Sequence, residues 1–307
     1  MLLPDSRFNR ATLIGLCAIL MWSVTVGLFR SVAEIFGPVA GAAIIFTVAG
    51  VFANVIIGAP SLKTIPRPYL WLGGSLFVLY EVLLALSIGM AADRTQALEL
   101  GMINYLWPSL TILFAVIARQ QRGHWCLLPA MLLCLLGIVC IMQGEGAWAI
   151  RHFWQNLQRN PLGYGMAMMA AITWAIYSVL TRRFGNGVNG VPLFLLATAL
   201  VLWLLYGLSD HPSPAFGLSG YIQAGVMGIL MASAYSCWNY GIQYGNLTIL
   251  ATLSYFTPVL SVLLASGWLK LQPGISVWYG VALVTLGSLL SGVASRAVET
   301  RETSGQR

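Results

Sequence analysis

The sequence contains very little charge. Of its 307 residues only 8% are Asp, Glu, Lys or Arg, whereas 58% are hydrophobic. Soluble domains carry roughly 25% charged residues, so this chain lacks the material for a water-exposed surface. The scarcity of charge excludes an ordinary soluble protein and makes lipid its main solvent. It also disfavours a multi-span β-barrel, whose lumen needs regularly alternating polar residues.

Catalytic and metal-binding motifs are also missing from the sequence. It has no HExxH, GxSxG or P-loop pattern, and its three histidines, His124, His152 and His211, lie far apart in predicted loops. The five cysteines lack zinc-type spacing, and we expect them to be inert apolar thiols. We therefore expect a protein that is not an enzyme and that binds no metal or cofactor.

Long apolar runs fill the chain instead. A membrane-spanning helix needs about 20 apolar residues. The sequence predicts an all-α integral membrane protein with ten transmembrane helices. They are expected at 11–30, 38–58, 68–90, 95–118, 123–143, 161–181, 189–208, 218–241, 246–268 and 274–294.

The net charge of +7 follows the predicted loops. If the N-terminus is cytoplasmic, eleven of the 16 Lys and Arg residues fall inside and five fall outside. This distribution obeys the positive-inside rule and orients both termini toward the cytoplasm. The basic balance therefore needs no nucleic acid, and membrane lipid is the expected surrounding partner. A monomer is compatible with this pattern.

A proline-centred motif occurs twice, 150 positions apart. Residues 104–110 are NYLWPSL and residues 254–260 are SYFTPVL. Gly137 pairs with Gly287 at the same offset, and Trp22 and Arg30 match Trp174 and Arg182 at an offset of 152. The first five predicted helices thus match the last five. Because five is odd, the second half must enter the membrane in the opposite sense, which predicts an inverted repeat.

The repeat divides the chain into segments. We expect a first five-helix repeat at 1–143, a connection at 144–160, a second repeat at 161–294 and a cytoplasmic tail at 295–307. In the connection, apolar residues recur at helical spacing at Ile150, Phe153, Trp154 and Leu157, which predicts an amphipathic helix at the membrane interface.

Glu81 lies in the middle of the third predicted span. A charged residue at the bilayer centre costs at least about 2.5–3.5 kcal/mol on insertion scales, so it needs a partner or a function. Glu81 could couple transport to protons or balance the charge of a substrate ammonium group. The alternative is a structural carboxyl group bonded to a neighbouring hydroxyl or backbone group.

The two prolines of the motif, Pro108 and Pro258, interrupt their helices. Each removes one helical hydrogen bond and frees a carbonyl four residues earlier, at Asn104 and Ser254. A free carbonyl within a membrane must face protein, water or ligand. We interpret both prolines as hinges beside a central cavity; the alternative is a kink that serves packing alone.

Aromatic residues, 11% of the chain, gather near these kinks. Buried Tyr and Trp rings suit aromatic or cationic ligands, although any single ring is as well explained by packing. Tyr235 and Tyr240 also lie deep in the predicted spans. The candidate substrate-binding residues are Trp22, Tyr80, Glu81, Asn104, Tyr105, Trp107, Trp174, Tyr177, Trp238, Asn239 and Tyr255.

These segments resemble the EamA-type transporters of the drug/metabolite transporter superfamily over nearly the whole chain. The resemblance rests on residues 11–16, on Tyr80-Glu81 followed by Leu84 to Ser87, on 101–114 and on 254–260. It implies ten helices in two inverted halves around a central cavity. It also implies export of aromatic amino acids, with other neutral amino acids and methyl viologen as further substrates.

We therefore predict an inner-membrane exporter of aromatic and other neutral amino acids that works by alternating access. A broad-specificity efflux carrier of drugs or cations with the same fold is the first alternative. A membrane enzyme or a receptor that does not transport is the alternative from another class.

Overall fold

The computed structural model describes residues 9–120, 125–142, 149–208, 217–269, 275, 278–287 and 289–290. Within these ranges all regular secondary structure is helical. The first half contains α1 (Arg10–Trp22), α2 (Thr25–Phe36), α3 (Pro38–Phe52), η1 (Ala53–Gly58), η2 (Tyr69–Gly73), α4 (Gly74–Gly89), α5 (Arg94–Asn104), α6 (Trp107–Ile117) and α7 (Leu127–Met142). The second half contains α8 (Ala149–Arg159), α9 (Pro161–Phe184), α10 (Val191–Leu208), α11 (Leu218–Tyr244), α12 (Leu247–Leu253) and α13 (Phe256–Leu269), and a further apolar helix spans Trp278–Gly287.

Asparagine begins three of these helices. The side chains of Asn9, Asn160 and Asn246 each accept a hydrogen bond from the backbone N–H of the residue three positions later. Each bond satisfies one of the N–H groups that a helix leaves unpaired at its start. Pro161 follows Asn160 directly and occupies the first turn, where its missing N–H costs nothing.

Four of the described helical stretches are long and apolar enough to cross a membrane: Pro38–Gly58, Tyr69–Gly89, Pro161–Phe184 and Val191–Leu208. The bent pair α1 and α2, with a 48° angle between them, makes a fifth if it is counted as one span. Several other predicted crossings are broken in the middle or extend beyond the described residues. The chain is therefore an all-helical protein with several membrane-spanning candidates.

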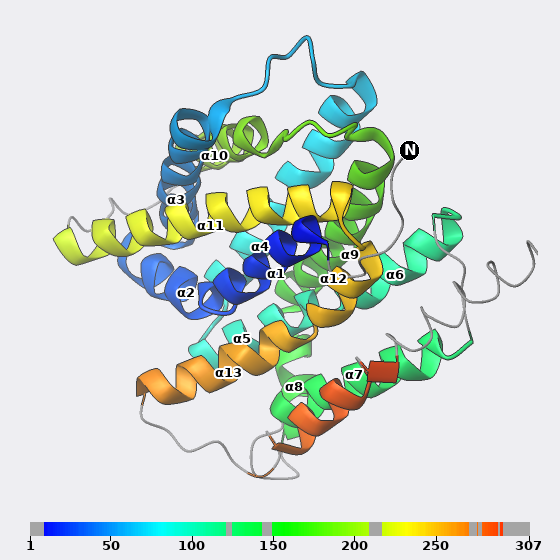
Figure 1. The fold of residues 1–307 in the computed structure, drawn as a ribbon. Helices are drawn as coiled ribbons and strands as arrows, with labels where there is room; N and C mark the ends of the chain where they lie inside the picture. The colour runs from blue at the N-terminus through cyan, green and yellow to red at the C-terminus, as the bar shows by residue number, and fades with distance from the viewer. Residues whose placement is uncertain are drawn as a thin grey trace, which may run out of the picture.

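Helices from the two halves of the chain interleave. α1 packs against α11, α4 against α9 and α3 against α10 (Figure 1). The first of these contacts is very close, because a Cβ atom added to Gly241 would lie 2.7 Å from the Cα of Gly15. Small residues at a crossing point let membrane helices approach in this way.

α7 lies beside the helix Trp278–Gly287, at the lower right of Figure 1. A Cβ on Gly137 would lie 2.7 Å from the carbonyl oxygen of Gly280, and a Cβ on Gly287 would lie 2.5 Å from Sγ of Cys134. The Cys134 thiol also donates to the carbonyl of Val284, 150 positions later. The two glycines that match in sequence thus perform the same task in one helix pair.

The helix α8 covers the residues for which the apolar spacing predicts an amphipathic helix. Trp154 is exposed, and Leu157 packs against the main core. Residues 144–148 of the predicted connection and the predicted tail 295–307 lie outside the described residues.

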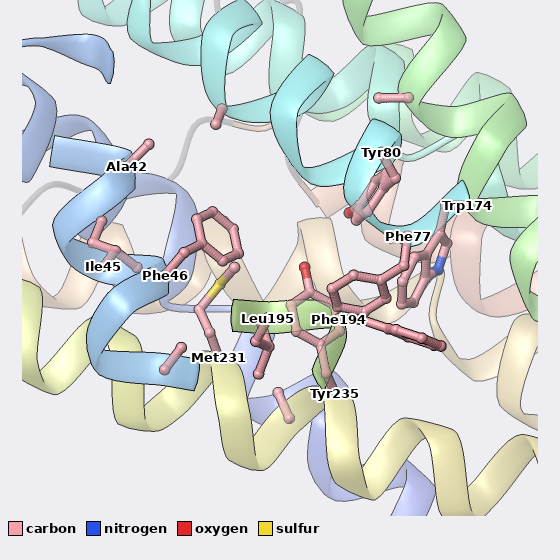
Figure 2. Packing of buried hydrophobic residues seen from close by; sticks show 14 of the residues in the cluster. Ala42, Ile45, Phe46, Phe77, Tyr80, Trp174, Phe194, Leu195, Met231 and Tyr235 are labelled. Carbon is pink, nitrogen blue, oxygen red and sulfur yellow. The ribbon is translucent and has the colours of Figure 1, made fainter. Parts of the chain in front are cut away.

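The main core is built from both halves (Figure 2). Ile45 and Phe46 of α3 pack near Leu195 of α10, while Phe77 of α4 meets Phe194 of α10 at a ring-centroid distance of 5.8 Å. The core continues into a cluster of aromatic rings on α4, α9 and α11. This cluster forms one wall of a cavity.

Candidate ligand-binding cavity

A cavity of about 70 Å³ lies where helices from both halves of the chain converge. Its walls come from α1, α2, α4, α5, α6, α9, α11 and α13, so both halves of the chain contribute. The lining residues are Trp22, Thr25, Phe29, Tyr80, Glu81, Leu84, Ala85, Ile88, Gly101, Asn104, Tyr105, Trp107, Trp174, Met227, Met231, Tyr235 and Thr257.

Trp22 is the centre of an aromatic cluster at this cavity. Its ring centroid lies 6.2 Å from that of Trp107, 5.8 Å from Trp174, 5.4 Å from Tyr235 and 5.3 Å from Trp238. Most of these pairs are edge-on or tilted, the arrangements that aromatic quadrupoles favour. The four tryptophans come from α1, α6, α9 and α11, so the cluster joins helices from both halves.

Tyr80 and Trp174 form the closest ring pair of the wall, with centroids 4.6 Å apart. Figure 2 places Tyr80 and Phe77 on α4 facing Trp174, with Tyr235 approaching from α11. Behind Trp174, the ring of Tyr177 is stacked at 5.1 Å. Tyr177 thus supports the wall without lining the cavity.

Two polar side chains from α4 and α5 bring unsatisfied acceptor atoms to the cavity. Glu81 is only 1% exposed, and one of its carboxyl oxygens meets the hydroxyl of Tyr235. Its Oε1 has no hydrogen-bond partner among the described residues. Asn104 donates its amide to the Tyr80 hydroxyl at 3.5 Å, while its Oδ1 is likewise without a partner among them.

Potential donors face the same region. Nε1 of Trp22 and Oγ1 of Thr257, both of which line the cavity, have no hydrogen-bond partner in the described part of the chain. Buried polar groups in proteins are usually paired, so unpaired groups that share a cavity need an explanation. A ligand with its own polar groups would satisfy them.

The cavity is small for an aromatic ligand in this structure. For comparison, an engineered apolar cavity of about 150 Å³ binds benzene. At about 70 Å³, the rings of the wall occupy much of the space that an aromatic side chain would need. Such a ligand therefore requires the helices that carry these rings to move apart.

The proline motifs coincide with two breaks in the helices. α5 ends at Asn104 and α6 begins at Trp107; α12 ends at Leu253 and α13 begins at Phe256. The first break brings Asn104, Tyr105 and Trp107 to the cavity, and the second brings Thr257. Pro108 is buried in the first turn of α6, whereas the side chain of Pro258 lies outside the described residues.

The predicted site residues separate into three groups. Trp22, Tyr80, Glu81, Asn104, Tyr105, Trp107 and Trp174 line the cavity. Trp238 and Tyr177 touch the rings that do so. Asn239 and Tyr255 lie apart from it.

Asn239 has its polar groups occupied elsewhere. Its amide donates to Asn189 Oδ1 at 2.8 Å and to the Tyr69 hydroxyl at 3.1 Å, and its Oδ1 accepts from Gln243 at 2.8 Å. Tyr255 is hydrogen-bonded to Ser109 and belongs to a second cluster with Tyr105 and Val284. Neither Asn239 nor Tyr255 is among the residues that line this cavity, and their role in substrate binding stays a prediction.

The sequence prediction missed several lining residues. Tyr235 had a sequence signal, since it is a deep aromatic residue near Trp238. Nothing in the sequence pattern predicted that it would contact Glu81. Met231 and Met227 lie four and eight residues before Tyr235 on the same face of α11. Their helical spacing from Tyr235 is the signal that could have found them.

Comparisons with known proteins fit this architecture. Residues 161–293 match the EamA-like transporter family. The aromatic amino acid exporters YddG of Salmonella typhimurium and Escherichia coli are each 43% identical to this chain, over 94% of it and 98% of their own length. A solved crystal structure at 29% identity superposes with a TM-score of 0.78 and covers 94% of this chain and 98% of the other.

These relatives extend over both halves of the chain, including the helices that form the cavity. They are transporters and not enzymes, which excludes the enzyme alternative. The matched region, the level of identity and the shared helical architecture agree with one another, and the chain belongs to the EamA-like transporter family.

Proposed function

We propose that this transporter exports aromatic amino acids across a bacterial inner membrane, with other neutral amino acids as secondary substrates. The observation that carries the proposal is the cavity walled by Trp22, Tyr80, Trp107 and Trp174, with Glu81 as the one charged residue among the described residues that line it. Rings recognise an aromatic side chain by stacking, and a carboxylate recognises an ammonium group. The names of the two 43% identical relatives support the same substrate class.

The proposed mechanism is alternating access between two inverted five-helix halves, 1–143 and 161–294. Ten crossings result if α1 with α2, α5 with α6, and α12 with α13 each form one interrupted crossing, while α7 and the helix from Trp278 each form another. Inverted repeats of this kind hold substrates near the middle of the membrane, where the halves meet. The mixed origin of the cavity walls supports this arrangement.

Paired contacts support the inverted repeat. Arg30, near the end of the first crossing, donates to the carbonyl oxygens of Ala91 at 3.0 Å and Ile88 at 3.4 Å, at the end of α4. Arg182, its match in the second half, donates to the carbonyl of Gly245 at 3.2 Å, at the end of α11. Each arginine thus joins the end of the first crossing of its half to the end of the third.

A second pair of contacts crosses between the halves. The Tyr255 hydroxyl is hydrogen-bonded to Ser109, and the Tyr105 hydroxyl interacts with the Ser261 side chain. In each case the tyrosine just before one proline meets a serine beyond the other proline. Rocking of the halves would have to change both contacts together, and the helix breaks at Pro108 and Pro258 are suitable hinges.

The test is transport by the purified protein in liposomes. Preloaded phenylalanine should drive uptake of labelled phenylalanine, and the rate should saturate. Trp71→Ala, which removes an exposed ring from η2, serves as a matched control for ring loss outside the cavity. Absence of flux with the folded protein, compared with empty liposomes, would contradict the proposal.

A broad drug or cation carrier is the second candidate, and Glu81 is the observation that favours it. The two candidates differ in whether amino acids are preferred over larger cations such as methyl viologen. Competition of each with labelled phenylalanine in the same liposomes separates them.

A further inference from the structure

The described residues that line the cavity carry charge of one sign only. Glu81 is the one acidic or basic side chain among its described lining residues. A zwitterionic amino acid would therefore meet a carboxylate at its ammonium end and only neutral donors at its carboxylate end. This asymmetry raises the question of which end anchors the ligand.

The acceptor end suits an ammonium group. Oε1 of Glu81 and Oδ1 of Asn104 both lack partners among the described residues, and both side chains are more than nine-tenths buried. An ammonium group carries three N–H donors and no acceptor. Two unpaired acceptors on residues that line the same cavity, with aromatic lining residues available for a cation–π contact, match that group.

The donors that line the cavity would bind a ligand's carboxylate more weakly than the acceptors bind its ammonium group. Nε1 of Trp22 and Oγ1 of Thr257 are the lining donors without partners in the described ranges, and both are neutral. Hydrogen bonds with one charged partner are weaker than those between two charged groups. A ligand that lacks its carboxylate therefore loses less than a ligand that lacks its ammonium group.

We infer, resting on the proposed function, that the cavity holds its ligand by the ammonium group. It therefore also binds primary aromatic amines that have no carboxylate. The added substrate class is the arylalkylamines, such as phenethylamine and tryptamine. Glu81 is the counter-ion and Asn104 the second acceptor. Aromatic acids without an amine are excluded, because their carboxylate would face Glu81 without a cation to balance it.

The test compares two fragments of phenylalanine on the unaltered protein. Phenethylamine lacks the carboxylate and 3-phenylpropionate lacks the amine, while both keep the ring and the chain. Calorimetric binding in lipid nanodiscs should give phenethylamine an affinity within about tenfold of phenylalanine, and 3-phenylpropionate an affinity at least about a hundredfold weaker. Equal binding of the two fragments, or stronger binding of the acid, overturns the inference.

A variant adds an independent test. Glu81→Gln keeps the shape of the side chain and removes its charge, and should weaken phenethylamine binding by about ten- to a hundredfold. Asp93→Asn is the matched control, since it makes the same chemical change at an exposed cap of α5 and retains the acceptor for the Gln96 N–H. Unchanged phenethylamine binding in folded Glu81→Gln overturns the role of Glu81.

The outcomes separate this inference from the proposed function. Transport of phenylalanine without binding of phenethylamine leaves the exporter intact and overturns the amine inference. Binding of phenethylamine that depends on Glu81, without phenylalanine flux, supports the amine site and contradicts amino acid export.

Discussion

The two broken helices at the proline motifs share a backbone plan but differ in the side chains beside it. In both, two residues separate the end of one helix from the start of the next, and the tyrosine of the motif is one of these two residues. The first break carries Asn104 and Trp107, which reach Tyr80 and the tryptophan cluster. The second carries Ser254, whose hydroxyl returns to the carbonyl of Leu250 in its own helix, and Thr257.

The comparison separates two tasks. The shared tyrosines each contact a serine beyond the other proline, so we assign them to the proposed symmetric frame of the inverted repeat. Trp107 and Thr257, which differ between the two motifs, both line the cavity, one with a large ring and one with a small hydroxyl. The cavity is therefore asymmetric, whereas the proposed frame is symmetric, and the predictions below test that division.

The largest effect is expected for Trp107→Ala. Truncation of a buried Trp typically costs about 3–5 kcal/mol, and here it also removes a ring from the cavity wall. Phenylalanine transport in liposomes should fall much more than alanine transport. Thr257→Val, at the matching position of the other half, should preserve the difference between the two substrates. Equal losses for both substrates in a folded Trp107→Ala variant would point to packing damage.

Glu81→Gln should alter the pH dependence of transport while the protein remains folded. A carboxyl group that gains and loses a proton during transport makes the rate depend on pH, and an amide cannot do so. Tyr80 and Tyr235 face Glu81 and remain in the variant. Transport rates across a pH series provide the measurement. A profile identical to that of the unaltered protein would exclude a proton role and leave only the counter-ion role.

Gly137→Ala and Gly287→Ala should destabilise the protein by similar amounts, about 1–3 kcal/mol each, because both add a Cβ against the opposing helix. Thermal unfolding in detergent measures the effect. Gly165→Ala is the control, since nothing lies within 4 Å of the position of its added Cβ. A large effect at only one of the two sites would break the proposed symmetry of this helix pair.

The smallest effects are expected at the matched arginines. Arg30 is hydrogen-bonded to Glu34 and two carbonyls, whereas Arg182 makes one bond to Gly245 and is more exposed. Arg30→Gln should therefore destabilise by about 1 kcal/mol and Arg182→Gln by less. Thermal unfolding of the two variants side by side is the measurement. A larger loss at Arg182 would reverse the assigned order.

Much of this molecule could be predicted from sequence because bilayers impose simple rules. The lack of charge, the apolar runs and the paired prolines predict helices and the positions of their breaks. They also identify Glu81 and Trp107 as unusual, since a buried carboxyl and a deep indole both need partners. The family relationship follows from the same segments.

Other residues could not be assigned in this way. Asn239 is a polar residue in an apolar helix, like Asn104, and both appear equally suited to bind a ligand. Only Asn239 finds Tyr69 and Asn189 at hydrogen-bonding distance, and these lie 170 and 50 residues away in the chain. The short-range pattern contains no information about such partners.

The sequence by itself determined that lipid is the main solvent, that the fold is helical, that the proline motif is repeated and where both helices break. Each of these depends on local composition and spacing. The tertiary structure alone decided which rings enclose the cavity and which polar atoms were left without partners there. The positions of Tyr235 beside Glu81 and of Thr257 at the cavity depend on how α11 and α13 pack against helices of the first half. Long-range packing therefore determined the chemistry of the cavity.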